Sequence, residues 1–270
     1  MGVAVKKEDD YVLLSGNDIG CLLMNYILSG KKAQGKLPDK PVVVSTVVSS
    51  KLTKPIAEKY GCEIRYVLTG FKYIGEQITQ LANQGCADRF LFGYEESYGY
   101  MAGDYCRDKD GVVTSMLVCE MASYYQTQGK SLLDALEELY REFGTYQYAM
   151  LNIMFEGEKG MIAMKEIMDS IRANHPTSIA GKKVIRFTDY WQSLSTDLLT
   201  GQKTEVTLPK SNVLVFELEG NASVIFRPSG TEPKVKSYIP ATGENIDIAA
   251  KLAQTLKDAA EKLIKGSDRL

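Results

Sequence analysis

Histidine and tryptophan are nearly absent from this sequence, with one residue of each among 270. Cysteine is also scarce: five residues, an odd number, are scattered without a Cys-x-x-Cys pair. The sequence therefore lacks the histidine and cysteine spacing of a zinc site. His175, in the polar segment "RANHPTS", is interpreted as a solvated loop residue and not as a general base. The cysteines are expected to be buried thiols in a reducing compartment.

Net charge is almost absent as well, because 32 basic residues are balanced by 34 acidic ones, giving −2. No overall field attracts nucleic acid or anionic lipid, so we expect no nucleic-acid partner and only a local anion site. No apolar run approaches the roughly 18 residues of a membrane span, and "MGVAVKKEDD" lacks the features of a signal peptide. These absences favour a folded cytoplasmic protein with no membrane partner.

Three segments with different patterns divide the chain. Residues 1–37 contain two short strand-like runs and one helical run, too little to close a core, and are expected to be the remnant of a preceding α/β domain. Residues 38–146 alternate strands and helices, which predicts an α/β domain with a mainly parallel or mixed sheet covered by helices. Residues 147–270 predict an α+β domain with an antiparallel sheet.

The segment "RPSGTEP" connects two runs that alternate like strands near the end of the chain. Pro228 fixes φ, and Gly230 can adopt a positive φ that turns backbone N–H groups inward. Ser229 and Thr231 add hydroxyl donors beside such a nest of amides. The residue types therefore favour a loop that binds an anion.

Two cations strengthen this interpretation. Arg227 supplies a planar fork that matches two phosphate oxygens, and Lys236 adds a point charge from the following strand. A loop with these groups is suited to a phosphate dianion. The alternative interpretation is a tight turn with an incidental arginine.

The segment "GYEESYGY" follows a predicted parallel strand, at the edge where open α/β sheets bind ligands. Glu95 and Ser97 are two residues apart, so in an extended segment both side chains point to one side. A carboxylate and a hydroxyl placed this way suit the vicinal hydroxyls of a sugar. The alternative is a solvated acidic loop.

Two further segments are expected at the same edge. In "TGFKYIGE", Thr69 and Gly70 present a hydroxyl and a backbone N–H. Positive charge is expected from Lys72 or from the pair Arg107 and Lys109 in "CRDKDG". Lys109 is the preferred proton carrier, since a lysine in a desolvated site with other cations holds its proton less tightly.

Together these segments resemble the α-D-phosphohexomutase family, the phosphoglucomutases and phosphomannomutases. The order "TG", "GYEES", "RDKDG", "RPSGTEP" carries the resemblance, which covers nearly the whole chain. Family members have four domains, and the three segments correspond to the end of the second, the third and the fourth. The resemblance implies that Lys109 is a candidate general acid or base. It also implies that the sugar and its phosphate are bound by Thr69, Gly70, Glu95, Ser97, Arg227, Ser229, Gly230, Thr231 and Lys236.

The sequence also departs from the family pattern. Nothing matches the loop with the catalytic phosphoserine, or the aspartate-rich loop that holds Mg²⁺ and should precede "GVAVKK". We therefore expect a C-terminal fragment of an isomerase, an intramolecular phosphotransferase that works through hexose 1,6-bisphosphate. The fragment binds sugar phosphates, has the missing N-terminal domains as partner, and is inactive alone.

Other functions fit the same residues. The chain is alternatively a stand-alone phosphosugar-binding module that has lost catalysis. The parent enzyme is alternatively a phosphopentomutase or a hexose bisphosphate synthase, because relatives with the same sugar loop differ in substrate. The residues do not separate glucose, mannose and pentose phosphates.

Overall fold

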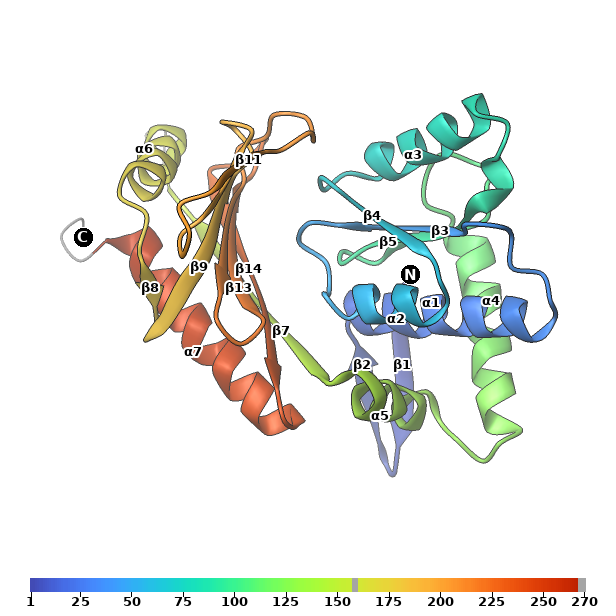
Figure 1. Ribbon diagram of the computed structural model, residues 1–270. Coiled ribbons are helices and arrows are strands. Elements are labelled where there is room, and N and C mark those ends of the chain that lie inside the picture. Colours follow the sequence, from blue (N-terminus) through green and yellow to red (C-terminus); the bar gives the residue numbers. More distant parts are fainter. Residues whose placement is uncertain (157–159, 267–270) are drawn as a thin grey trace. The chain divides into compact units, whose positions relative to one another are not determined.

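The computed structural model describes residues 1–156 and 160–266 (Figure 1). The chain divides into two compact units, Met1–Phe143 (unit 1) and Gly144–Leu270 (unit 2). The last four residues of the predicted α+β segment lie outside the described residues. None of the helices described is both long enough and apolar enough to span a membrane.

Unit 1 combines a small hairpin with a sheet that helices cover. In chain order its elements are β1 (Val3–Lys7), β2 (Asp10–Leu14), α1 (Gly16–Ala33), β3 (Val42–Thr46), α2 (Thr53–Lys59), β4 (Glu63–Val67), α3 (Phe71–Asn83), the short 3-10 helix η1 (Ala87–Arg89), β5 (Phe90–Glu95), β6 (Gly99–Ala102), α4 (Gly111–Gln126) and α5 (Leu132–Phe143). The two strands β1 and β2 form a separate antiparallel sheet.

The main sheet of unit 1 is mixed, with the strand order β4-β3-β5-β6. Strand β3 pairs in parallel with β4 and β5, and β6 pairs antiparallel with β5. Helix α3 lies on one side of this sheet and α1 and α2 on the other (Figure 1). On the α3 side, Ile74 and Ile78 pack into a buried cluster with Val42 and Val44. The predicted α/β fold is confirmed.

Helix α1 belongs to unit 1, which differs from its expected place in a preceding domain. Ser15 and Asp18 form a capping box at its start, as the polar residues before the apolar run favour. Its apolar face is buried against the sheet, and Gly20 allows a close approach, because a Cβ there would lie 2.4 Å from the ring of Tyr94. The pattern alone did not indicate which sheet this face covers.

Unit 2 is built on one antiparallel sheet. Its elements are β7 (Thr145–Met154), α6 (Gly160–Ala173), β8 (Ser178–Ile179), β9 (Lys182–Asp189), β10 (Leu194–Asp197), β11 (Lys203–Glu205), β12 (Leu214–Leu218), β13 (Ala222–Pro228), β14 (Lys234–Gly243) and α7 (Ile246–Lys265). The strand order is β11-β10-β9-β12-β13-β14-β7, with β8 beside β9. This arrangement confirms the predicted α+β class.

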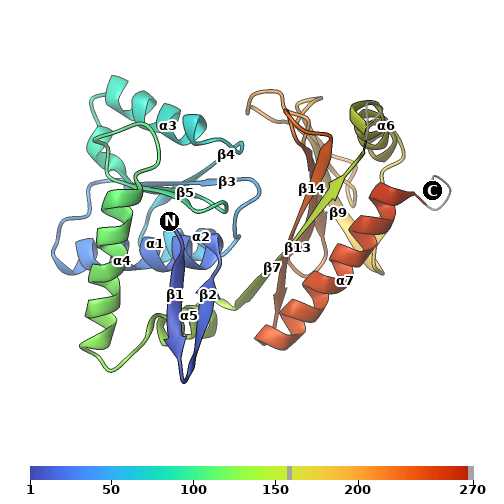
Figure 2. The ribbon, with the colours of Figure 1, turned by 180° about the vertical axis from the view of Figure 1, so that it is seen from behind.

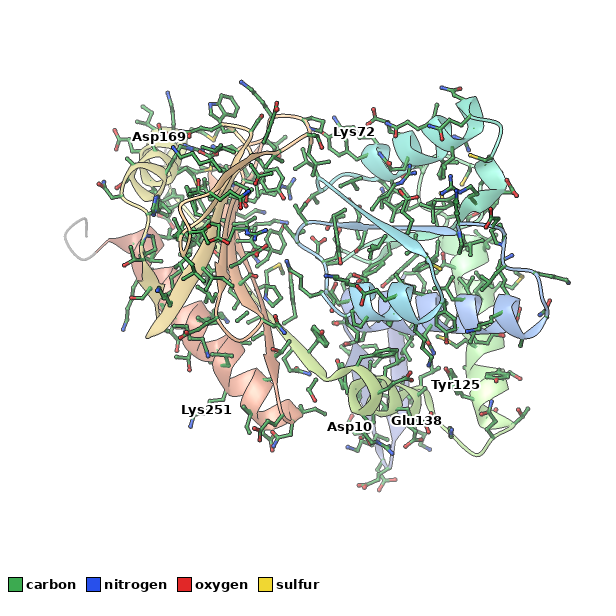
Figure 3. All side chains as sticks on the ribbon, in the orientation of Figure 1. Asp10, Lys72, Tyr125, Glu138, Asp169 and Lys251 are labelled. Carbon is green, nitrogen blue, oxygen red and sulfur yellow. The ribbon has the colours of Figure 1, made fainter. Side chains whose placement is uncertain are left out.

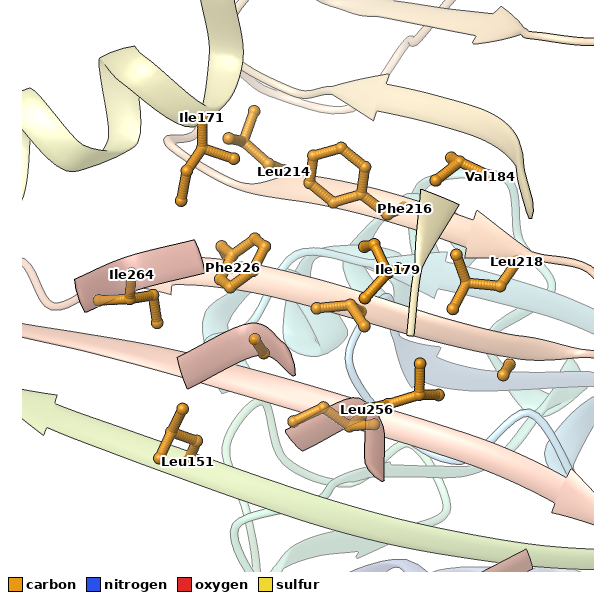
Figure 4. Close-up of a cluster of buried hydrophobic side chains, with 14 of the residues drawn as sticks. Leu151, Ile171, Ile179, Val184, Leu214, Phe216, Leu218, Phe226, Leu256 and Ile264 are labelled. Carbon is orange, nitrogen blue, oxygen red and sulfur yellow. The ribbon is translucent and has the colours of Figure 1, made fainter. Parts of the chain in front are cut away.

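Both helices of unit 2 pack on the same face of the sheet (Figure 2). Ile171 of α6 and Leu256 of α7 join Phe216 and Phe226 of the sheet in one buried cluster (Figure 4). Because strand side chains alternate, Arg227 points to the opposite face from Phe226. The face without helices therefore carries the arginine of the predicted phosphate loop.

Two expectations about single residue types are wrong. The ring of His175 packs 4.6 Å from that of Phe187, measured between centroids, and its Nδ1 is buried, so the residue is not a solvated loop residue. Only some cysteines are buried. Cys21 and Cys62 are buried, Cys86 and Cys106 are partly exposed, and Cys119 is exposed.

Candidate functional site

The predicted phosphate loop is the turn between β13 and β14. Its ends are joined by the Ser229 N–H, which donates to the carbonyl of Lys234 at 2.8 Å. The Ser229 hydroxyl accepts from the N–H groups of Thr231 and Glu232 at 3.4 and 3.3 Å. Gly230 is not in the left-handed region, so the expectation of a positive φ is wrong. Here a side-chain oxygen, and not a glycine conformation, organises the amides.

Arg227 and Lys236 face each other across β13 and β14, because they are direct partners in the antiparallel register. Directly opposed residues project from the same face, and opposed like charges are unfavourable. Neither cation forms an ion pair with a carboxylate among the residues described. The Arg227 guanidinium instead donates to the hydroxyl of Tyr238 at 3.3 Å. The arrangement of these two cations would suit an anion.

The acidic residue of the loop is already neutralised. The Lys234 ammonium lies 2.7 Å from the Glu232 carboxylate, and their hydrogen bond lowers the pKa of Glu232 below its usual value. The charge of Lys236 contributes to the same direction more weakly. Glu232 therefore interacts mainly with Lys234.

The segment "GYEES" forms a β-hairpin and not an extended loop. Glu95 ends β5, Ser97 lies in the turn, and Gly99 begins β6 opposite Glu95. The argument that Glu95 and Ser97 share a side in an extended segment is therefore wrong, since the chain reverses between them. Ser97 is exposed at the turn, whereas Glu95 is buried, with 6% of its surface accessible.

Glu95 is held by the start of helix α3. Its Oε1 accepts the N–H of Gly70 at 2.5 Å, and Gly70 is the N-cap residue of α3 with a φ of 130°. A carboxylate at this end of a helix is stabilised by the helix dipole. The amide expected to face a sugar is therefore bound to Glu95. The Oγ1 of neighbouring Thr69 is buried and has no hydrogen-bond partner among the described residues, so a ligand hydroxyl could pair with it.

Lys109 reaches the same corner of unit 1 from the loop before α4. A Cβ on Gly99 would lie 3.3 Å from Lys109 Cδ, and Lys109 Nζ lies 5.6 Å from the ring centroid of Phe71. Its ammonium is 3.4 Å from Asp108, and 57% of the side chain is exposed. Lys109 therefore does not lie in the desolvated site with other cations that the sequence predicted. The backbone N–H of Lys109, and then its side chain, lower the pKa of Asp108.

Arg107 has a different role from the one predicted. Its guanidinium donates to the carbonyls of Asp104 and Cys106 at 2.7 and 3.0 Å, and its Nε donates to Thr79 at 3.2 Å. Thr79 lies eight residues after the start of α3, roughly 12 Å along the helix. Arg107 therefore anchors its own loop to the middle of α3. Gly70, Glu95 and Lys109 lie at one corner of unit 1, and the guanidinium of Arg107 is bonded elsewhere.

Three residues beside the candidate binding residues escaped the sequence reasoning. Gly99 and Phe71 line the side chain of Lys109, and Tyr238 contacts Arg227. A signal was present for the first two, because Gly99 lies within "GYEESYGY" and Phe71 within "TGFKYIGE", the two segments already expected at this edge of the sheet. Tyr238 carried no signal beyond the alternation of its strand.

Comparisons with known proteins identify relatives of the chain in sequence and in fold. Residues 15–143 match the model of phosphoglucomutase/phosphomannomutase, alpha/beta/alpha domain III. A phosphoglucomutase from Staphylococcus epidermidis is 36% identical over 253 residues, which is 93% of this chain and 44% of that protein. The chain belongs to the phosphoglucomutase/phosphomannomutase family. A phosphoglucomutase from Staphylococcus haemolyticus is 38% identical and covers 86% of this chain and 41% of its own length. This family member thus spans less than half the length of these curated relatives.

Solved structures share the fold of this family member. A Thermus thermophilus protein assigned as a phosphomannomutase matches with a TM-score of 0.60, at 19% identity over 94% of this chain and 42% of its own. The parafusin phosphoglucomutase from Paramecium, in its open form, matches with a TM-score of 0.59, at 16% identity over 92% of this chain and 42% of its own. The match to the domain III family model begins at residue 15, before α1, so α1 and the β5–β6 hairpin both fall within the matched region.

The resemblance implies Mg²⁺ for the family, and the described residues do not fit it. Within 1–156 and 160–266, no three His, Cys, Asp or Glu side chains gather in a way that could hold a metal ion. Asp10 at the β1–β2 turn accepts the N–H of Tyr11 at 2.7 Å and is exposed. The described part of the chain therefore offers Mg²⁺ no set of ligands of its own.

Proposed function

We propose that this chain provides the sugar- and phosphate-binding part of a phosphohexomutase of the phosphoglucomutase type. The parent reaction interconverts hexose 1-phosphate and hexose 6-phosphate through a phosphoserine and a hexose 1,6-bisphosphate. The observation that carries the proposal is the pair of cations, Arg227 and Lys236, opposed on one sheet face without a carboxylate between them in the described residues. Folding alone gives no reason to keep such a pair.

A phosphate dianion satisfies this pair. The planar fork of Arg227 contributes parallel hydrogen bonds to two phosphate oxygens, and Lys236 contributes a compact charge from the neighbouring strand. The Ser229 hydroxyl keeps the turn in shape by accepting the N–H groups of Thr231 and Glu232, and the Thr231 hydroxyl adds a donor for the phosphate. Each of these groups recognises phosphate without regard to which carbon of the sugar carries it. Phosphate recognition that does not depend on the sugar carbon suits a hexose 1,6-bisphosphate intermediate, which must bind in both orientations.

The residues of unit 1 are proposed to bind the sugar. Glu95 accepts hydrogen bonds from sugar hydroxyls, and the buried Thr69 hydroxyl and exposed Ser97 hydroxyl are further partners. Lys109 exchanges a proton with the sugar hydroxyl that gains or loses the phosphoryl group. Arg107 contributes indirectly, by holding the loop that carries Lys109.

The phosphoryl donor and Mg²⁺ are assigned to the part of the longer relatives that this chain does not match. Mg²⁺ there would neutralise charge during phosphoryl transfer. On this proposal the chain binds sugar phosphates in the cytoplasm without turning them over. Robust conversion of glucose 1-phosphate to glucose 6-phosphate by the purified chain would contradict it.

Calorimetry with glucose 1,6-bisphosphate tests the proposal directly. Arg227→Ala removes a charge-assisted, bidentate contact and is expected to cost about 1.5 to 3 kcal/mol, or roughly 10- to 150-fold in Kd. Arg186→Ala is the matched control, since Arg186 is also a sheet arginine but lies near Asp197 and Glu217, at 3.7 and 4.0 Å. Equal losses in both variants would show non-specific attraction, and no binding by the unmodified chain would refute the proposal.

A competition series addresses substrate class. Glucose 1-phosphate, mannose 1-phosphate and ribose 1-phosphate share the phosphate and differ in the sugar that Glu95 and Ser97 would meet. Preference for glucose 1-phosphate in the unmodified chain, reduced in Ser97→Ala, supports the assignment of the hairpin to the sugar. Equal affinity for all three, and for inorganic phosphate, would limit recognition to the phosphate.

A further inference from the structure

Gly99 leaves a space in β6 that two other side chains occupy. A Cβ added there would lie 3.3 Å from Lys109 Cδ and 3.3 Å from two ring carbons of Phe71. Such distances are shorter than ordinary van der Waals contact, so the space is filled already. The aliphatic stem of Lys109 therefore crosses the strand at Gly99, directly opposite Glu95.

The two neighbours differ in their freedom to move. Phe71 is the first residue of α3 and is 4% exposed, packed in the buried cluster on this face of the sheet. Lys109 has a flexible side chain, but its loop is fixed beside β6, because the Asp110 N–H donates to the carbonyl of Tyr100 at 2.9 Å. Any atom added at Gly99 therefore displaces Lys109 and not Phe71.

The ring of Phe71 also fixes the end of the lysine. Lys109 Nζ lies 5.6 Å from the ring centroid, within the range at which an ammonium is attracted to an aromatic face. Among the described residues, the ammonium forms an ion pair with Asp108, 3.4 Å away, an exposed neighbour on the same loop. Phe71 directly follows Gly70, whose N–H holds Glu95. One short segment thus sets the position of both the carboxylate and the ammonium.

We propose that Gly99 and Phe71 are positioning residues that hold the Lys109 side chain across Gly99, the strand partner of Glu95, at the hairpin proposed to bind the sugar. This inference rests on the proposed function, in which Lys109 meets the sugar phosphate. Gly99 acts by leaving room for the lysine stem, and Phe71 acts by attracting its ammonium. Neither residue needs to contact the ligand.

Acetylation of lysines by an amine-reactive acetyl ester, followed by mass spectrometry, tests the positioning without any ligand. Gly99→Val and Phe71→Leu are expected to raise the modification rate of Lys109 about two- to fivefold, the range that a lost cation–π contact and lost packing allow. Phe71→Tyr keeps the ring and should restore the original rate. Lys72, at the start of α3 (Figure 3), is the internal control, because its ammonium lies over a different ring, that of Tyr73, at 4.8 Å.

A matched glycine controls for general loosening. Gly111 lies two residues after Lys109, and a Cβ there would meet no atom within 4 Å, so Gly111→Ala should leave the rate unchanged. An unchanged Lys109 rate in Gly99→Val, or equal acceleration of Lys72, would overturn the inference. This outcome does not depend on whether the chain binds any sugar phosphate.

A double-mutant cycle on glucose 1,6-bisphosphate affinity tests whether the positioning serves binding. Gly99→Val alone is expected to weaken binding about threefold or more, by roughly the same factor as Lys109→Ala. In the Lys109→Ala background, Gly99→Val should have no further effect. Additive losses would assign Gly99 a role that does not pass through Lys109 and would overturn the inference. Absence of binding by the unmodified chain would refute the proposed function, while the acetylation rates still decide the positioning.

Discussion

The two candidate binding regions differ in whether their charged side chains have partners within the protein. At the β5–β6 hairpin of unit 1, the fold already uses the charged groups: Glu95 caps α3 through Gly70, and Arg107 anchors its loop. On strands β13 and β14 of unit 2, Arg227 and Lys236 are opposed without an ion pair among the described residues. The charged groups at the hairpin therefore have protein partners without a ligand. The two cations of the strand pair, Arg227 and Lys236, have no carboxylate partner among the described residues.

This difference separates two kinds of functional evidence. A locally unfavourable arrangement such as the cation pair favours a functional interpretation, because selection for folding alone would tend to remove it. A satisfied arrangement such as Glu95 and Gly70 is ambiguous, because the same contact serves stability and binding. Substitutions at the hairpin should therefore disturb folding and binding together, while those at the strand pair should separate them.

The largest effect on stability is expected at Gly16, which packs against the hairpin, and Gly230 in the turn between β13 and β14 is its matched control. A Cβ on Gly16 would lie 2.0 Å from the carbonyl oxygen of Glu96 in the hairpin turn, whereas one on Gly230 would meet nothing within 4 Å. Gly16→Ala should therefore lower the free energy of unfolding of unit 1 by about 3 kcal/mol through overpacking. Gly230→Ala should change stability by less than about 0.5 kcal/mol.

Hydrogen exchange in unit 1 and fluorescence of Trp191, the one tryptophan, which lies in unit 2, follow the two units separately. Loss of stability in unit 2, or a stable Gly16→Ala variant, would contradict this contrast between the regions.

A smaller loss is expected when the hairpin carboxylate is removed. Glu95→Ala leaves the Gly70 N–H at the start of α3 without its acceptor, which should cost unit 1 about 2 kcal/mol. Glu95→Gln retains an acceptor oxygen and should recover much of that loss, while weakening any contact that needs the charge. Exchange of the first α3 amides measures the effect. Equal stability of Glu95→Ala and the unmodified chain would show that the cap is not structural.

At the strand pair the sign of the stability change should reverse. Lys236→Ala removes one of two opposed like charges and should stabilise unit 2 by about 0.5 kcal/mol at low salt, with less effect at high salt. The same variant should bind inorganic phosphate more weakly, so phosphate raises its Tm less than that of the unmodified chain. Thermal unfolding with and without phosphate measures both effects. A destabilised Lys236→Ala variant with unchanged phosphate response would remove the argument for an anion site.

The fold was predictable where periodicity extends over whole elements. The alternation of strands and helices gave the α/β unit, and the strand-rich second half gave the antiparallel sheet. Strand β6, "GYMA", was missed because four residues without a β-branched side chain carry too little pattern to be recognised. Missing it also removed the hairpin, and with it the true geometry of Glu95 and Ser97.

The candidate site was predictable in residue type and less so in geometry. Arg227 and Lys236 were identified from their chemistry, but their direct opposition is a matter of register, which the sequence does not specify. Gly70 was expected to face a ligand, yet its N–H is satisfied by a carboxylate 25 residues away in sequence. Arg107 likewise has partners that no local pattern indicates. Long-range partners decide which polar groups remain for a ligand.

The smallest effect concerns thiol chemistry, which reports on unit 1 alone because all five cysteines lie there. Burial raises the pKa of the Cys21 thiol to about 12, and a hydrogen bond with Tyr94 opposes this only in part. At pH 8 the thiolate fraction of folded Cys21 is therefore about one in ten thousand, while exposed Cys119 should react readily with iodoacetamide. Because the folded pKa is raised, the stabilising contribution of Cys21 is complete below the unfolded pKa near 9 and is lost as pH rises toward 12.

Labelling of Cys21 should accelerate in Gly16→Ala and not in Gly230→Ala or Lys236→Ala. Acceleration in the last two variants would show that disturbance of the strand pair also opens unit 1, and the two regions would not be independent.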